Sequence, residues 1–148
     1  MGSTAVQLLE ELIDEVRLGW HVLIQVGERL HASEPITLGM RSVLEVLLEH
    51  GPRTVPDIAR RRVVTRQHVQ VLVNGLLDLR LVTLADNPAH KRSSLVSLSP
   101  SGERTIRRML KRERDSWARG ELAVSPQELR RAVATLRSVR EHIAARTP

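Results

Sequence analysis

Between residues 54 and 92 the sequence specifies two consecutive helices followed by a hairpin, and this order restricts the fold more than any other feature of the chain. Thr54 can cap the first helix, Pro56 needs no partner for its nitrogen in the first turn, and Asp57 completes a capping box. The second helix follows Thr65. Its apolar residues recur at helical spacing on one face: Val69, Leu72, Val73 and Leu76.

The opposite face of this second helix is polar and cationic. It carries side chains that hydrogen-bond to base edges or to phosphates: Arg66, Gln67, His68 and Gln70. Two adjacent capped helices, the second with such a face near its start, are the outline of a helix-turn-helix. Capped helix pairs are also common in helical proteins of other kinds, so the residues that follow decide the interpretation.

Two short apolar segments follow, at residues 81–84 and 95–98, and the second alternates inward and outward residues as a strand does. Asn87-Pro88 favours a turn between them, and Lys91 and Arg92 make the tip of the hairpin cationic. Helix, helix and a hairpin with a basic tip form a winged helix-turn-helix. The sequence therefore predicts a mainly α fold with a small β-wing, and it favours binding to double-stranded DNA.

Composition excludes several other classes of protein. The chain has 148 residues, 41% of them apolar, which is enough for a real core. Its only aromatic residues are Trp20 and Trp117, so we do not expect base stacking, the usual device for single-stranded nucleic acid. No cysteine is present and the six histidines lack metal-ligand spacing, so neither a metal nor a cofactor is expected.

The sequence also lacks the motifs of common enzymes. It has no nucleophile elbow, phosphate-binding Gly-rich loop or HExxH motif, so we expect no catalysis. No signal peptide or membrane-spanning run is apparent, which makes the cytoplasm the expected location. The formal charge is +6: residues 1–36 carry two basic and six acidic groups, whereas residues 37–100 carry nine and five. This distribution indicates a polyanion-facing surface away from the N-terminal segment.

Helices are predicted on both sides of the winged lobe. A long helix over residues 4–32 carries more apolar surface than a lobe spanning residues 37–100 can cover, which suggests a second chain. A further capping box, Ser125-Pro126-Gln127-Glu128, begins a last helix that extends to about residue 145. Residues 1–36 and 101–148 therefore bracket the predicted DNA-binding lobe on both sides.

The whole chain resembles the MarR family of bacterial transcriptional regulators. The resemblance is carried by Asp57-Ile58-Ala59-Arg60, by Thr65-Arg66-Gln67-His68-Val69, and by residues 86–102, DNPAHKRSSLVSLSPSG, which are the most specific. It implies a repressor that binds a pseudo-palindromic operator as a homodimer. It also implies that residues 1–36 and 101–148 form a dimerisation region, with the first and last helices at the dimer interface. It also implies a pocket for a small lipophilic or aromatic effector. Four residues of the converging helices are candidates to line it, or else plain core: Trp20, Ile24, Met40 and Met109.

Departures from the family pattern bear on the details of DNA contact. Val63 and Arg80 occupy positions where the family often has glycine, and a left-handed backbone there would cost about 1–2 kcal/mol at each residue. Val71 stands where an arginine often faces the phosphates, and His90 replaces a common acidic residue of the wing.

These observations assign roles to the candidate residues. Three residues are expected to contact bases: Gln67, His68 and Gln70. Arg66 is expected to contact phosphate, and Lys91 and Arg92 the backbone or the adjacent minor groove. Arg53 and the run at residues 60–62 are open between phosphate contact and solvated charge. The alternative function is a winged-helix module that binds protein and has no specific affinity for DNA.

Overall fold

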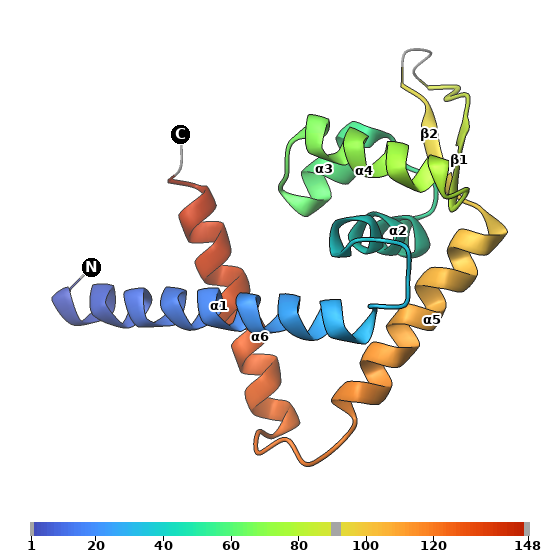
Figure 1. Cartoon of the computed structure of the whole chain (residues 1–148). Coiled ribbons are helices and arrows are strands. Elements are labelled where there is room, and N and C mark those ends of the chain that lie inside the picture. The colour runs from blue at the N-terminus through green and yellow to red at the C-terminus, as the bar shows by residue number, and fades with distance from the viewer. Residues whose placement is uncertain (1, 90–92, 147–148) are drawn as a thin grey trace. The chain divides into compact units, whose positions relative to one another are not determined.

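The computed structural model of the chain describes residues 2–89 and 93–146, arranged as two compact units, Met1–Arg114 and Asp115–Pro148, which we treat separately (Figure 1). Within the described residues the elements, in chain order, are α1 (Ser3–Leu30), α2 (Leu38–His50), α3 (Val55–Arg62), α4 (Arg66–Asp78), β1 (Val82–Ala85), β2 (Leu95–Leu98), α5 (Pro100–Trp117) and α6 (Pro126–Ala144). No helix in this described part is long and apolar enough to cross a membrane.

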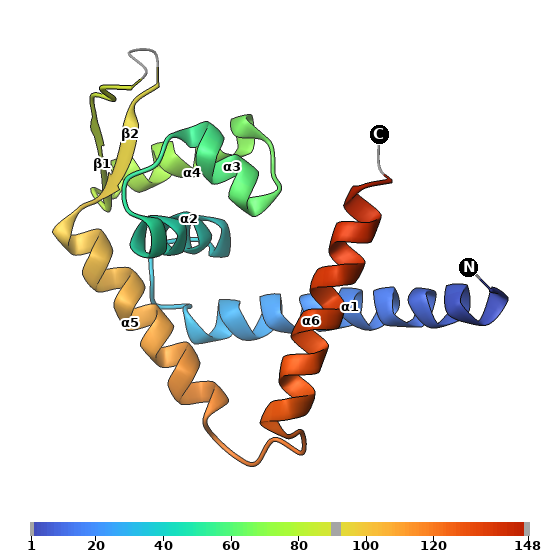
Figure 2. The same ribbon diagram turned by 180° about the vertical axis from the view of Figure 1, so that it is seen from behind.

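Threonine caps begin the three helices of the lobe. The side-chain oxygens of Thr37, Thr54 and Thr65 each accept a backbone N–H three residues on, at 3.2, 3.3 and 3.1 Å respectively. Each cap satisfies one of the free N–H groups of a first turn, which is why α3 and α4 begin where the sequence predicts. Gly51, with φ of 72°, ends α2 and turns the chain toward α3 (Figure 2).

The core of the lobe lies where α2, α3, α4 and α5 meet the hairpin. Its largest members are entirely or almost entirely inaccessible to solvent: Val43, Leu44, Ile58, Val69, Val73, Leu76, Val96, Ile106 and Met109. All are aliphatic or Met, as the scarcity of aromatic residues requires. Truncation of any such Leu or Ile to Ala would cost about 2–5 kcal/mol, so the lobe is a rigid support for the residues on its surface.

The hairpin is a two-stranded antiparallel sheet. Val82 pairs with Leu98 and Ala85 with Leu95, so β1 begins one residue later than predicted. The reason is that the Leu81 N–H donates to the Leu76 carbonyl at 2.9 Å, which makes Leu81 part of the end of α4. Arg53 and Val96 exchange both backbone hydrogen bonds, at 3.1 and 2.9 Å, which joins the segment before α3 to the wing.

Two residues other than glycine have a left-handed backbone, and they are the two that the sequence singled out. Val63 has φ of 55° after α3 and Arg80 has φ of 56° after α4. The Val64 N–H donates to the Ala59 carbonyl at 3.1 Å, which is the hydrogen bond of a Schellman-type helix end. Both turns therefore keep the geometry for which glycine is suited, although neither has glycine.

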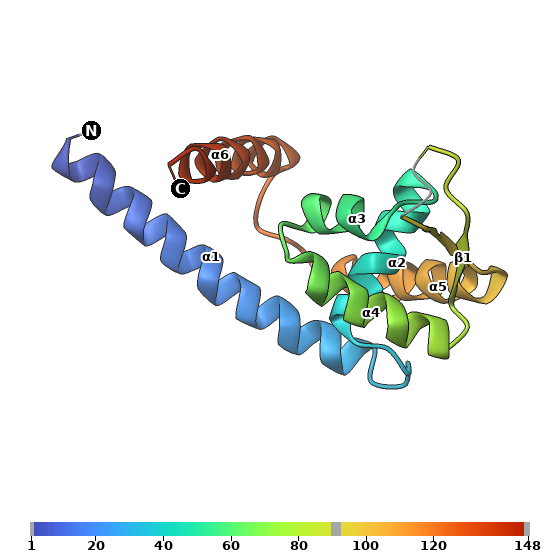
Figure 3. The same cartoon turned by 90° about the horizontal axis from the view of Figure 1, so that it is seen from above.

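Large parts of α1 and α6 are exposed. The last turns of α1 lie beside α2, and the rest of that helix extends away from α2, α3 and α4 (Figure 3). Along α1, Leu18, Trp20 and Val22 are each about 60% exposed. In the second unit, α6 begins with the predicted capping box and has no buried residue, and Trp117 is 63% exposed.

Candidate nucleic-acid interface

The two faces of α4 have opposite environments. Val69, Val73 and Leu76 are at most 1% exposed and hold the helix to the core. The side chains predicted to contact DNA all lie on the exposed side: Arg66, Gln67, His68 and Gln70. We call these four exposed residues the outward face of α4; Arg66, Gln67 and Gln70 lie on its wing side, whereas His68 lies on the side toward α1. Because burial of the opposite side fixes the helix, the outward face is presented to solvent on a rigid support.

The outward face continues into the base of the wing. A shallow hollow of about 470 Å³ is lined by Arg66, Gln67 and Gln70 from α4, by Leu84 from β1 and by residues 93–94, which precede β2. Gln70 also donates from Nε2 to Oδ1 of Asn74, one helical turn further on, at 2.9 Å. Asn74 is exposed on the same side of the helix and extends the polar surface beyond the residues that the sequence analysis selected.

The tip of the wing, which includes the predicted contacts Lys91 and Arg92 and the unusual His90, lies outside the described residues. The described strands that carry it are held to the core by Val82 and Val96, which are 2% and 0% exposed.

The arginines at the start and end of α3 divide into two groups. Arg53, Arg60 and Arg61 line a hollow of about 700 Å³ between the start of α3 and the wing. Arg62 instead donates from Nη2 to the Glu45 carboxylate at 2.7 Å and is two-thirds buried. Among the first three, Arg60 already pairs with Asp57 one turn earlier on the exposed side of α3, so an anionic partner would compete with that ion pair, whereas Arg62 has a structural role.

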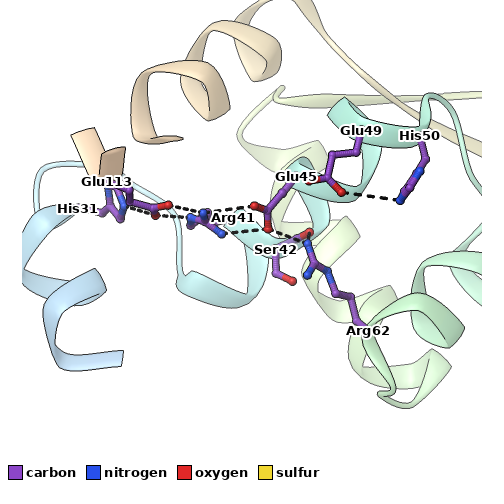
Figure 4. A network of polar contacts seen from close by, with 8 residues as sticks. All are labelled: His31, Arg41, Ser42, Glu45, Glu49, His50, Arg62 and Glu113. Atoms are coloured by element: carbon purple, nitrogen blue, oxygen red, sulfur yellow. Dashed lines mark hydrogen bonds and ion pairs between the residues drawn. The ribbon is translucent and has the colours of Figure 1, made fainter. Parts of the chain in front are cut away.

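Arg62 is one end of a chain of polar contacts that joins four helices (Figure 4). Glu45 in α2 receives hydrogen bonds from Arg62 and, at 3.2 Å, from Arg41 Nη1. Arg41 also donates through Nε and Nη2 to both oxygens of Glu113 in α5. His31, which follows α1, lies with Nε2 2.8 Å from the Glu113 carboxylate and donates to it. The contacts tie the end of α3, directly before α4, to α1 and α5.

The carboxylates of this region are stabilised in their charged form. Burial raises the pKa of Glu113, but hydrogen bonds from Arg41 and His31 lower it by more, so that it lies below its ordinary value of 4.5. The pKa of Glu34 is lowered chiefly by a hydrogen bond from Arg108, against the effect of burial. These groups therefore act as permanent ion pairs at neutral pH.

A larger cavity of about 810 Å³ lies where α1 meets the helix-turn-helix. Trp20 and Ile24 line it, as does His68 from the first turn of α4. Met40 and Met109, the other two candidate pocket residues, do not: Met40 packs against α4 at Gly75, and Met109 is fully buried. The volume lies within the range of small-molecule sites, and the walls combine apolar side chains with charged ones, among them Glu28 and Arg62.

These features define a winged helix-turn-helix protein with the polar side of its second helix exposed. The MarR family model matches residues 41–93, which span α2 to the tip of the wing. An uncharacterized protein of Mycobacterium tuberculosis is 36% identical over 124 residues, which cover 84% of each chain. An uncharacterized HTH-type transcriptional regulator of Mycobacterium bovis is 30% identical over 107 residues, or 70% of this chain and 74% of the relative. The chain belongs to the MarR family of transcriptional regulators.

Solved structures confirm the fold along nearly the whole chain. A MarR family transcription regulator superposes with a TM-score of 0.82 at 22% identity, covering 97% of this chain and 95% of that one. Staphylococcus aureus MarR in complex with salicylate and kanamycin gives 0.79 at 16% identity and covers 95% of each chain. Reduced AbfR bound to DNA gives 0.76 at 17% identity, covering 97% and 99%.

Sequence reasoning missed two sets of residues. Asn74 could have been found, because it lies four residues after Gln70 and seven after Gln67, on the same helical face. The ion pair of His31 with Glu113 gave no such signal, because 82 residues separate its partners.

Proposed function

We propose that this protein represses transcription by binding, as a homodimer in the cytoplasm, a pseudo-palindromic site on double-stranded DNA. The outward face of α4 carries the proposal, because its polar and cationic side chains are exposed on a helix whose other side is fixed in the core. A relative named as an HTH-type transcriptional regulator and a neighbour solved with DNA support it. Two recognition helices would enter successive major grooves about 34–36 Å apart.

Within this proposal the side chains have separate roles. Gln67, His68 and Gln70 contact base edges in the major groove, where amide and imidazole groups match the pattern of donors and acceptors. Arg66 contacts a phosphate beside the start of α4. Lys91 and Arg92 contact the backbone or the minor groove from the wing, and so fix the register of the protein on the duplex.

The exposed apolar residues of α1 and α6 support the homodimer. Leu18, Trp20 and Leu23 of α1 are each more than half exposed, and Val133 of α6 is 57% exposed. Apolar surface of this extent is unusual on a monomer and is ordinarily covered by a partner. A second copy of the chain presents the same two helices and would also supply the second recognition helix.

The cavity beside Trp20 and Ile24 supports release by a small lipophilic or aromatic effector. Its walls include α1 and the first turn of α4, so an occupant would touch both the dimerisation helix and His68. A neighbour of the same fold was solved with salicylate. Salicylate is therefore a suitable first probe: binding should raise the melting temperature of the free protein and weaken its complex with DNA.

Selection of bound sequences from random DNA duplexes tests the proposal directly. We expect an inverted repeat whose half-site centres are about 10 base pairs apart, and a two-chain mass in light scattering. Gln70→Ala should relax sequence preference, whereas Arg66→Ala should weaken binding to cognate and random duplexes alike and reduce the salt dependence. Equal effects of the two substitutions on both kinds of duplex would contradict the assigned roles.

A second candidate is a winged-helix module that binds protein. The observation in its favour is Val71, which is 64% exposed beside the outward face and places an apolar group there. Titration of the wild type with a random duplex at rising salt separates the two functions. A steep loss of affinity with salt supports the DNA-binding protein, and no measurable binding at low salt supports the protein-binding module.

A further inference from the structure

The side chain of Gln70 is held by a neighbour before any DNA arrives. Its Nε2 donates to Oδ1 of Asn74 at 2.9 Å, across one turn of α4. Both residues are exposed, and Gln70 is the fifth residue of the helix whereas Asn74 is the ninth. Since the N-terminal part of a recognition helix reaches the base edges, Gln70 lies where bases are contacted and Asn74 is set back from them.

The direction of this hydrogen bond determines which donor and acceptor groups of the Gln70 amide remain free to contact a base. A primary amide carries two N–H donors and one carbonyl acceptor, and Asn74 occupies one of the donors. One N–H and the Oε1 acceptor remain. An adenine in the major groove presents the complementary pair, the N7 acceptor and the N6 amino donor, and glutamine pairs with it through two hydrogen bonds.

We infer that Gln70 selects an adenine in each half-site and that Asn74 is a positioning residue for this contact. This inference rests on the DNA-binding function proposed above. A free glutamine side chain must lose rotamer freedom when it binds, which costs affinity. Asn74 restricts that freedom in the unbound protein, as pairs of amides four residues apart do on helices. The role of Asn74 is therefore to raise the selectivity of Gln70 without contacting the base.

The test uses the full-length protein and the duplex that emerges from random-sequence selection. Gln70→Ala should abolish preference at one position of each half-site, and that position should be an adenine, preferred over other bases by roughly 5- to 150-fold in the wild type. Replacing this adenine with 7-deazaadenine removes the N7 acceptor. It should weaken the wild type and leave Gln70→Ala unchanged.

Substitution of Asn74 tests the positioning role. Asn74→Ala should reduce the preference for adenine about two- to five-fold, with no effect in the Gln70→Ala background. Asn74→Asp keeps the oxygen acceptor and should keep the preference, while its negative charge lowers affinity for every duplex. Alanine at position 74 favours the helix, so circular dichroism should show intact folding in this variant.

Each contrary result refutes a distinct statement. Insensitivity of the wild type to 7-deazaadenine would overturn the adenine contact. An equal effect of Asn74→Ala with and without Gln70 would show that Asn74 contacts DNA independently, which would overturn the positioning role. Failure of the wild type to select any duplex would refute the proposed function itself, and the inference with it.

Discussion

Replacing Val63 with glycine should stabilise the protein, although glycine ordinarily destabilises. Val63 has φ of 55° and ψ of 45°, and an L-residue in this region costs about 1–2 kcal/mol relative to the right-handed one. Val63 is 86% exposed, so removing its side chain loses almost no packing. Glycine adds about 0.5–1 kcal/mol of conformational entropy to the unfolded chain. The expected net gain is about 0.5–1 kcal/mol.

Urea denaturation at one fixed protein concentration measures this gain, because stability of a dimer depends on concentration. The midpoint should rise with no change in slope, and the melting temperature should rise by about 1–4 °C. Val63→Ala is the matched control: it keeps the β-carbon and should therefore recover much less of the strain. A loss of stability in Val63→Gly, or an equal gain in both variants, would show that the backbone at Val63 is not strained by its side chain.

Two substitutions and one pH titration test the ion pairs and the helix cap that hold α4 in place. Glu113→Gln should lower the free energy of unfolding by about 1.5–3 kcal/mol, because it removes the charge that accepts two hydrogen bonds from the largely buried Arg41 and leaves that residue paired with Glu45. The exposed Glu49→Gln is the control, expected within about 0.5 kcal/mol. Because folding depresses the pKa of Glu113, its ion pair stabilises the protein above the ordinary pKa of 4.5, and this stabilisation disappears as the pH falls further. When the free energy of unfolding is measured against pH, it should therefore fall less below pH 4.5 in Glu113→Gln than in the wild type. Thr65→Ala removes the cap of α4 and should lower the free energy of unfolding by about 1 kcal/mol. It should also increase hydrogen exchange at the His68 amide, and unchanged exchange there would contradict the capping role.

The parts of the fold that follow from neighbouring residues were predictable from the sequence. The caps at Thr54, Thr65 and Ser125 act within three residues, so they mark helix starts without knowledge of tertiary structure. The start of β1 was misplaced by one residue because the N–H of Leu81 completes the end of α4, a contact that periodicity does not report. The replacement of glycine by valine at position 63 is recognisable only against a family pattern, since an isolated valine in a sequence carries no sign of its backbone angle.

The candidate site was predictable only where it lies on one helix. The outward face of α4 follows from helical periodicity, whereas the cavity beside Trp20 depends on how α1 meets α2, α3 and α4. Only two of the four residues predicted to line this cavity do so. Met40 and Met109 were selected for being on helices that converge, but convergence does not determine which side of a helix faces a cavity and which faces the core.

The chain of polar contacts explains how a strained turn can precede α4. Arg62 donates from Nη2 to the Ser42 carbonyl at 3.0 Å as well as to Glu45, so the last turn of α3 is fixed to α2. On the other side of the turn, Val69 is buried in the core. With both ends held, Val63 has no freedom to relax, and strain persists where the surrounding structure determines the backbone. Since Glu45 also contacts Arg41, and Arg41 contacts Glu113, the position of α4 depends on a residue of α5 that is not part of the outward face of α4.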